Sequence, residues 1–209
     1  MRWLSSHWRR PRGGPDLAAV SARFVAIDLE TTGLDPRRDA IVAAAAIPFV
    51  GGEPQPGFVT LVHPGRPIPP TSTAIHGITD EMVAGAPAVP PALRALEDAC
   101  GTDVLVGHGV DFDLAVIGRE RRAHRLGPLA NRALDTMRLA AALHRGWTDH
   151  GLDAVAARVG VSITGRHTPE GDAVAAGRIL LALLPALAQH GLRTVPELIW
   201  FQESASLHP

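Results

Sequence analysis

The chain has 209 residues, of which 46% are hydrophobic and 20% are charged, and its formal net charge is −1. This length suits one domain with a substantial core, and the near-neutral charge excludes a protein that coats nucleic acid through bulk electrostatic attraction. Because Cys100 is the single cysteine, a disulfide framework within the chain is excluded as well, which favours a cytoplasmic location.

Residues 1–20 are expected to form an arm in front of a domain that occupies residues 21–209. The arm combines four arginines and two tryptophans with a Gly-Gly-Pro turn. A surface-packed or floppy extension is the favoured interpretation, and an arm that contacts nucleic acid is the alternative. No secretory signal and no membrane-spanning segment are expected, because the longest apolar run, residues 40–50, contains Pro48 and falls far short of the ~20 residues that a span needs.

Three strands joined by short loops are predicted in the first part of the domain, which indicates an antiparallel meander. They are expected at residues 24–30, 41–50 and 58–62, with turn residues between them. Prolines and glycines dominate residues 66–91 and leave room for one short helix at 79–83.

The second part alternates between strand and helix patterns. A helix that begins at Pro90 and ends at Gly101 precedes a strand at 104–106, and a helix at 111–124 follows it. The last strong helix is predicted at 169–189. With no internal repeat, the pattern indicates a single α/β domain.

Asp28 and Glu30 lie two residues apart on a strand that otherwise reads as core. Residues i and i+2 of a strand point to the same face, so both carboxylates would project side by side, where unpaired charge is costly. A bound Mg²⁺ or Mn²⁺ ion would neutralise them. The alternative is that Asp28 caps a turn and Glu30 pairs with an arginine.

Two further acidic positions follow strand or loop ends. Asp113 lies in the first turn of the helix after the 104–106 strand, where open α/β sheets place their sites. Asp111 is expected to be the N-cap of that helix, and His108 a satisfied loop histidine. Asp172 lies at the end of the first turn of the last helix, and the loop residue before its Thr168 N-cap is a histidine, His167.

In this order the elements resemble the motifs of the DnaQ-like DEDD exonucleases, and the resemblance covers roughly residues 23–184. The third motif of that family has either histidine or tyrosine as its base. This chain has no tyrosine and carries His167, so it resembles the DEDDh subtype. The matching segments are residues 24–34, 75–79, 107–113, 134–136 and 167–176.

The resemblance implies an RNase H-like fold, which is a mixed five-stranded sheet with its first three strands antiparallel and helices on its flanks. It implies hydrolysis of phosphodiester bonds from the 3′ end of single-stranded nucleic acid, with release of nucleoside 5′-monophosphates. One of two Mg²⁺ or Mn²⁺ ions would lower the pKa of a bound water, and the other would stabilise the leaving 3′ oxygen. Four carboxylates would hold the ions: Asp28, Glu30, Asp113 and Asp172.

The same resemblance assigns roles to four other residues. His167 would take the proton of the water, since the ordinary pKa of histidine, ~6.5, suits a base near neutral pH. Thr31, Leu34 and His76 would hold the terminal nucleotide, with Leu34 against its base. The chain departs from the family at Gly109, where asparagine is usual after the histidine of the second motif.

Rival functions are weaker. A phosphatase of the haloacid dehalogenase type needs Asp-x-Asp and usually a lysine, whereas here the second acid is Glu30 and the chain has no lysine. A non-catalytic nucleic-acid-binding module would have lost some of the carboxylates.

DNA is favoured over RNA as substrate, and a free-standing enzyme over a subunit that docks on a DNA polymerase. Trp200 and Phe201 are either such a docking patch or ordinary packing.

A basic stretch around one helix is expected to be a solvated face, with phosphate steering as the alternative. It consists of Arg119, Arg121, Arg122 and Arg125.

Overall fold

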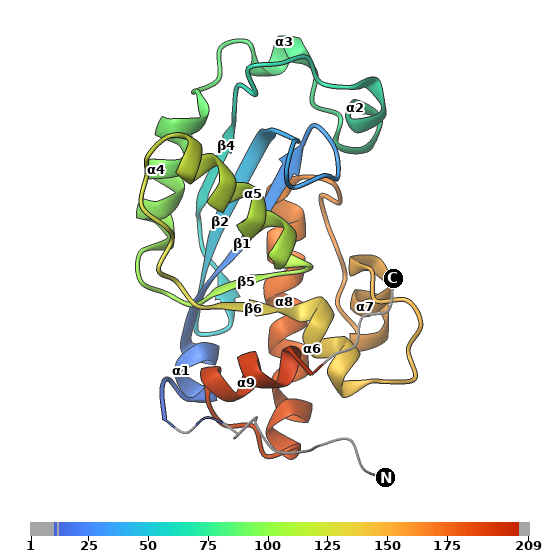
Figure 1. Cartoon of the computed structure of the whole chain (residues 1–209). Helices are drawn as coiled ribbons and strands as arrows, with labels where there is room; N and C mark the ends of the chain where they lie inside the picture. The colour runs from blue at the N-terminus through green and yellow to red at the C-terminus, as the bar shows by residue number, and fades with distance from the viewer. Residues whose placement is uncertain (1–10, 12, 205–209) are drawn as a thin grey trace.

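Residues 11 and 13–204 are described by a computed structural model, in which one mixed sheet lies between two layers of helices (Figure 1). The sheet order is β3-β2-β1-β5-β6, and β4 also pairs with β2. The β1, β2 and β4 strands are antiparallel, as predicted, whereas β5 and β6 extend the sheet in parallel. The strands are β1 Arg23–Thr31, β2 Ile41–Val50, β3 Glu53–Pro54, β4 Phe58–Leu61, β5 Leu105–Gly107 and β6 Ala133–Asp135.

The sheet has six strands rather than the predicted five, because the two residues of β3 pair with the end of β2 beyond the Gly51-Gly52 turn. The helices also differ from the prediction in the proline-rich segment. Two short helices, not one, form there, and α2 ends at Gly77 in the left-handed conformation (φ 73°). The helices are α1 Leu17–Ala22, α2 Pro70–His76, α3 Asp80–Val83, α4 Val89–Cys100, α5 Val110–Ala123, α6 Thr136–Leu143, α7 Leu152–Val159, α8 Pro169–Gln189 and α9 Val195–Gln202.

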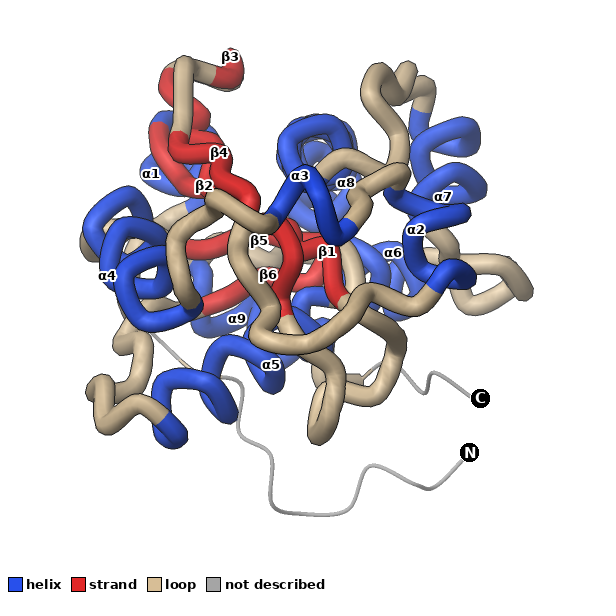
Figure 2. The backbone as a smooth tube through the Cα atoms, turned by 90° about the horizontal axis from the view of Figure 1, so that it is seen from above, coloured by secondary structure: helices blue, strands red, loops and turns tan. Residues whose placement is uncertain are grey.

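The alternation of side chains along β1 decides where its acids point. Val25 and Ile27 pack into the core beneath α4 and α5, and Phe24 and Ala26 pack on the opposite face, against α8. Figure 2 shows the strands between these helix layers. Asp28 and Glu30 continue the Phe24–Ala26 series, so they face the side of the sheet that α8 covers.

The α8 helix is long and apolar enough to cross a membrane by length and composition alone. The apolar run at residues 40–50 lies almost entirely in β2. In the fold, α8 buries residues such as Ile179, Leu180 and Leu183 in the core, and it makes many of its contacts with β1 and β2. The α8 helix is therefore a core helix of this domain.

Gly177 lets α8 lie close to the sheet. A Cβ atom at this position would lie 2.4 Å from ring carbons of Phe49, whose ring stacks on Phe24. We expect Gly177→Ala to destabilise the fold by ~1–3 kcal/mol through overpacking.

Gly118, in the middle of α5, is the matched control, because its Cβ would meet only the flexible Arg122 side chain, at 3.6 Å. Gly118→Ala should stabilise the fold by up to ~1 kcal/mol through helix propensity. Urea unfolding of both variants measures the two effects. Equal and small effects would contradict the close approach at Gly177.

Both ends of the described chain pack on the domain. Asp16 caps α1 by accepting the Ala19 N–H at 2.7 Å, and Val20 is buried. Residues 1–10 and 12 of the predicted arm lie outside the described residues. The α1 helix spans the predicted boundary between arm and domain after residue 20, and this division of the chain stays a prediction. Phe201 of α9 packs against the core, in agreement with ordinary packing.

Candidate active site

Three acidic side chains converge where β1 meets the start of α8. Each of Asp28, Glu30 and Asp172 offers a carboxylate oxygen, and these atoms all lie within 4.8 Å of one another. The β2 neighbours of Asp28 and Glu30 are Ala45 and Ala43, whose small side chains leave room beside the acids. The register of β1 and β2 shifts directly after Glu30, and such irregularities are frequent next to active sites.

Asp113 joins this group from the other side of the sheet. Its Oδ1 accepts the backbone N–H of Leu29, between the two β1 acids, at 3.0 Å, and its side chain is only 5% exposed. The α5 helix begins directly after β5, the strand that pairs with β1 in parallel, so its first turn lies beside the acidic part of β1. Three of the four predicted metal-binding carboxylates therefore converge, and the fourth, that of Asp113, lies close enough to Asp28 to raise its pKa.

Burial and mutual repulsion hold these carboxyl groups in their protonated form more strongly than usual. Burial raises the pKa of Asp28 well above its ordinary value, and the carboxylates of Asp113, Asp172 and Glu30 raise it further. Burial and then Asp172 raise the pKa of Glu30 to about 7. Burial also raises the pKa of Asp113 and Asp172. The cluster therefore lacks sufficient positive charge for all four groups to ionise.

One basic side chain does reach the cluster. Arg166 pairs with Asp172 and, at 3.0 Å, with Asp153 of α7, and its charge partly offsets the effect of burial on the pKa of Asp172. The other oxygen of Asp172, Oδ1, is buried and has no hydrogen-bond partner among the described residues. A buried carboxylate oxygen without a partner, beside two further carboxylates, fits a hard divalent cation such as Mg²⁺ or Mn²⁺.

We expect divalent metal to stabilise the protein in a pH-dependent way. Because the folded pKa of Asp28 and Glu30 lies above the unfolded value of ~4, metal-free stability should fall as pH rises from ~4 through ~7. Ionised carboxylates bind metal and protonated ones do not. Saturating Mg²⁺ or Mn²⁺ should therefore raise the Tm by roughly 5–10 °C at about pH 8 and by much less at about pH 5.

Thermal unfolding in EDTA and in metal, across this pH range, measures both trends. Asp28→Asn should flatten the metal response. A metal-free Tm that rises steadily from about pH 4 to pH 7, or an equal metal response at both ends, would contradict this account of the cluster.

His167 lies in the loop directly before α8, half-buried, with a φ of 62°. Left-handed backbone is uncommon for a residue other than glycine, and such strain concentrates at functional sites. Thr168 fixes the loop, since its hydroxyl donates to the Gly165 carbonyl at 2.6 Å and accepts the Gly171 N–H at 3.1 Å. A Cβ at Gly171 would lie 2.1 Å from the Gly165 carbonyl oxygen, so glycine is required for this close approach.

A cavity of about 370 Å³ lies beside His167 and Thr168, between the start of α8 and the segment that carries α2 and α3. His76 lines the same cavity, and burial lowers its pKa, with nearby His167 contributing in the same direction. The volume lies within the range of small-molecule sites. Of the three residues expected to hold a nucleotide, His76 alone lines this cavity.

Thr31 is instead the last residue of β1, and Leu34 lies in the β1–β2 loop (residues 32–40). The Thr31 hydroxyl donates to the Gly33 carbonyl at 2.6 Å. Leu34 is 86% exposed, although it is a large apolar residue.

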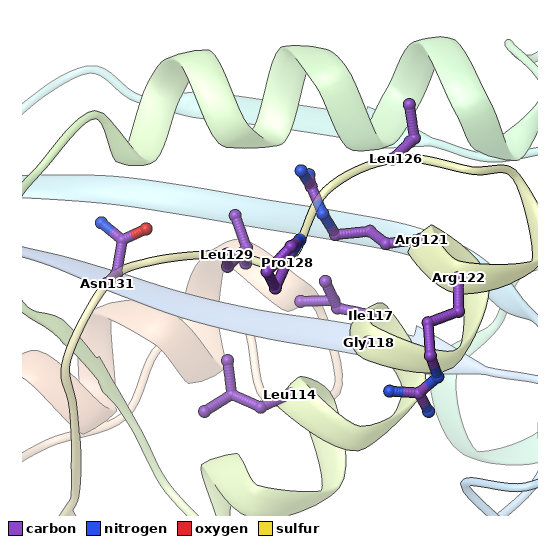
Figure 3. A pocket seen from close by; sticks show the side chains of 9 residues that line it. All are labelled: Leu114, Ile117, Gly118, Arg121, Arg122, Leu126, Pro128, Leu129 and Asn131. Carbon is purple, nitrogen blue, oxygen red and sulfur yellow. The ribbon is translucent and has the colours of Figure 1, made fainter.

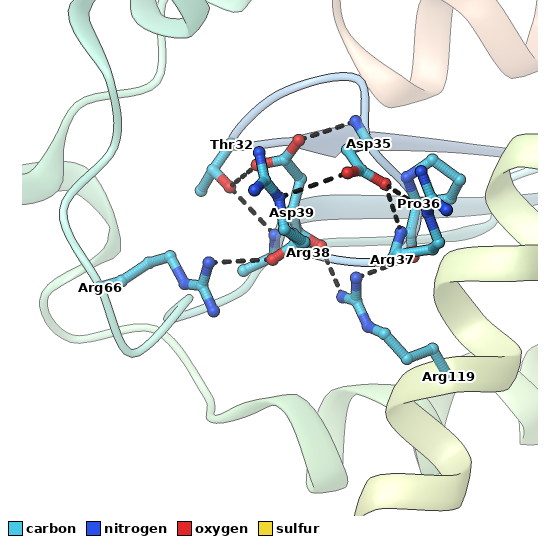
Figure 4. A network of polar contacts seen from close by, with 9 residues as sticks. Thr32, Asp35, Pro36, Arg37, Arg38, Asp39, Arg66 and Arg119 are labelled. Atoms are coloured by element: carbon cyan, nitrogen blue, oxygen red, sulfur yellow. Dashed lines mark hydrogen bonds and ion pairs between the residues drawn. The ribbon is translucent and has the colours of Figure 1, made fainter.

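The β1–β2 loop that presents Leu34 is fixed from within and from outside (Figure 4). The Asp39 carboxylate accepts the Asp35 N–H at 2.8 Å and the Thr32 hydroxyl at 3.1 Å. From α5, Arg119 donates to the carbonyls of Pro36, at 2.8 Å, and Asp39. The exposed leucine therefore stands on a preorganised loop.

Residues 25–180 match the family model described as Exonuclease. The chain belongs to this family. The match confirms the resemblance drawn from the motifs. A relative named "DNA polymerase III subunit epsilon-like protein" from Rhodobacter capsulatus is 45% identical over an alignment of 193 residues, which covers 88% of this chain and 27% of the relative. The chain thus spans about a quarter of the length of that relative.

Two solved structures show the same fold as this exonuclease-family chain. One is "Exonuclease X in complex with 5′ overhanging duplex DNA", with a TM-score of 0.65 and 24% identity over 86% of this chain and 98% of the other. The second is E. coli Exonuclease I in complex with a dT13 oligonucleotide, with a TM-score of 0.69 and 18% identity over 81% of this chain and 42% of the other.

The structure explains why this exonuclease-family chain can carry glycine at position 109, where the resemblance leads us to expect asparagine. Gly109 has a φ of 72°, a left-handed conformation that asparagine also adopts more readily than other residues, and its N–H donates to Asp135 at 2.9 Å. Gly109, not Asp111, is the N-cap of α5. Asp111 is exposed and pairs with Arg138 at 3.3 Å, so its predicted capping role is wrong.

His108 is a satisfied histidine, as predicted. Its ring nitrogens lie 2.9 Å from the Thr136 hydroxyl and 2.8 Å from the His150 carbonyl, and burial lowers its pKa to about 4. Sequence reasoning overlooked Arg166. Its position next to His167 was the available signal, but its contact with Asp172 depends on how the loop before α8 turns.

Proposed function

We propose that this chain is a metal-dependent 3′→5′ exonuclease that releases nucleoside 5′-monophosphates, with DNA as the favoured substrate. The observation that carries the proposal is the group of carboxylate oxygens from Asp28, Glu30 and Asp172 within 4.8 Å, next to the strained loop residue His167. Carboxylates that serve only the fold gain nothing from such a cluster, because each negative charge raises the free energy of ionising its neighbours.

The side chains divide the chemistry as follows. Asp28, Glu30, Asp113 and Asp172 would hold two Mg²⁺ or Mn²⁺ ions, which supply an activated water and stabilise the leaving 3′ oxygen when bound. His167 accepts the proton of the attacking water as general base. His76 and Thr31 position the terminal nucleotide, whose sugar or base enters the cavity shared by His76 and His167. Leu34 packs against the terminal base, which would account for its exposure.

DNA is favoured by what similar proteins are said to do. The R. capsulatus relative is named as epsilon-like for DNA polymerase III, and the two solved structures of the same fold are complexes with duplex DNA and with dT13. A free-standing enzyme in the cytoplasm belongs to the same proposal, with docking on a DNA polymerase as the alternative. The relative's name supports polymerase docking, and the lone cysteine supports the cytoplasmic location.

The decisive test uses 5′-labelled single-stranded DNA and an RNA of the same sequence, each with Mg²⁺, Mn²⁺ or EDTA. A ladder that shortens from the 3′ end in metal and not in EDTA supports the reaction and its polarity. Faster cleavage of RNA would overturn the preference for DNA in favour of an RNA-trimming enzyme. Cleavage of neither strand by folded, metal-loaded protein would favour a nucleic-acid-binding module.

A further inference from the structure

The arginines of α5 fall into two groups that the sequence did not separate. Arg121 is 3% exposed and pairs with Glu97 of α4 at 2.9 Å, so the expected solvated face is wrong for this residue. Arg119 is used to hold the β1–β2 loop. Arg122 leaves the helix in a different direction from Arg121 (Figure 3). It is exposed and forms no ion pair with another described side chain.

Across from Arg122, the β1–β2 loop contributes further positive charge. The side chains of Arg37 and Arg38 are 89% and 81% exposed. Both pair with the same carboxylate, that of Asp35, at 3.4 and 3.3 Å. The other carboxylate of the loop, that of Asp39, is engaged inside the loop by a threonine hydroxyl and the Asp35 N–H, so the charged groups that the loop exposes most are the two guanidinium groups.

A groove of about 280 Å³ lies between the loop and the helix. Arg37 and Arg122 are among the residues that line it, and Pro36 and Leu114 give it apolar surface. Leu114 directly follows Asp113, so the first turns of α5 carry both a wall of the groove and one of the four acids. Apolar surface beside guanidinium groups matches a nucleic-acid strand, whose sugars and bases contact apolar atoms while its phosphates accept charge-assisted hydrogen bonds.

We propose that this groove binds the phosphodiester backbone of the substrate strand on the 5′ side of its cleaved end, with Arg37 and Arg122 as phosphate contacts. The inference rests on the proposed function for the direction of the strand. Arg119 keeps the groove preformed, because its hydrogen bonds to two carbonyls of the β1–β2 loop join the loop to α5. A preformed groove binds its ligand without the entropic cost of ordering a loop.

Binding is tested first, in EDTA, by fluorescence anisotropy with labelled single-stranded DNA of about 12 nucleotides, a length within the site sizes of single-strand grooves. Arg37→Ala and Arg122→Ala should each weaken binding about five-fold at low salt, and each should reduce the salt slope by about 0.7. Arg178→Ala is the control, since Arg178 is an exposed arginine of α8 on the opposite side of the sheet. Equal behaviour of all three variants, or no binding by the unaltered protein, would overturn the proposal.

Hydrolysis then separates this inference from the proposed function. The double variant Arg37→Ala/Arg122→Ala should lose at least about ten-fold in kcat/KM on the long strand, mainly through KM, and should cleave a dinucleotide as fast as the unaltered protein. Equal loss on both substrates would overturn the groove assignment, as would a loss confined to a duplex with no effect on the single strand. If no variant cleaves either substrate but the binding differences persist, the nuclease proposal fails and the groove stands.

Discussion

Asp28→Asn and Asp172→Asn should each reduce nucleic-acid hydrolysis by about 10³-fold or more. Bound metal ions stabilise transition-state charge by several kcal/mol, and each 1.4 kcal/mol, roughly, is a factor of ten in rate. Replacing either carboxylate removes a member of the group whose oxygens lie within 4.8 Å. Steady-state cleavage of 5′-labelled single-stranded DNA in Mg²⁺ and Mn²⁺ measures the loss.

Stability separates loss of chemistry from loss of fold in these variants. Burial and neighbouring acids raise the pKa of Asp28, so its ionised form is unfavourable in the metal-free protein at neutral pH. Asp28→Asn should therefore unfold at the same temperature as the unaltered protein in EDTA, or at a higher one. Asp98→Asn, at an exposed position of α4, is the matched control and should leave the rate unchanged. Full activity in a folded Asp28 variant would remove the metal assignment.

His167→Asn should lower the rate of hydrolysis by ~10²–10⁴ if the imidazole is the general base. Asparagine suits this test better than alanine, because it tolerates the left-handed backbone at this position (φ 62°) yet its amide cannot accept the proton. The loss should fall on kcat, since the side chain acts in the transition state.

Metal binding gives the second readout for this variant. The proposed metal ligands are four carboxylates and do not include His167, so the increase in Tm on addition of Mn²⁺ should match that of the unaltered protein. His124→Ala, at the exposed end of α5, serves as the histidine control. A rate unchanged from the unaltered protein would refute the role of base, and a lost metal response would reassign His167 as a ligand or a support of the site.

The predicted placement of Asp28, Glu30 and Asp172 came from local rules that the fold obeys, and their assignment to metal came from the resemblance to the exonuclease family. Residues i and i+2 of a strand point to the same face, so Asp28 and Glu30 project from the same side of β1. Thr168 and Pro169 fix the start of α8 by capping chemistry, which placed Asp172 at the end of its first turn. The segment that matches the Exonuclease family model contains all of these positions.

Local rules were least successful where residues from different elements share a partner. Asp111 looked like an N-cap, but Gly109 takes that position because its left-handed backbone lets its N–H reach Asp135, 26 residues away. The α2 helix was not predicted because it is short and lies in a segment rich in proline and glycine, which indicate turns and loops rather than a helix.

The sequence by itself determined the antiparallel start of the sheet, the long last motif helix, the face on which β1 carries its acids, and the residue types available for metal and base chemistry. These depend on periodicity and capping, which act over a few residues. Only the tertiary structure decided that Arg166 pairs with Asp172, that Arg119 and Arg121 are used internally, and that Arg37 and Arg122 flank one groove. Each of these contacts depends on the direction of a long, flexible side chain, and that direction is set by packing between segments distant in the chain.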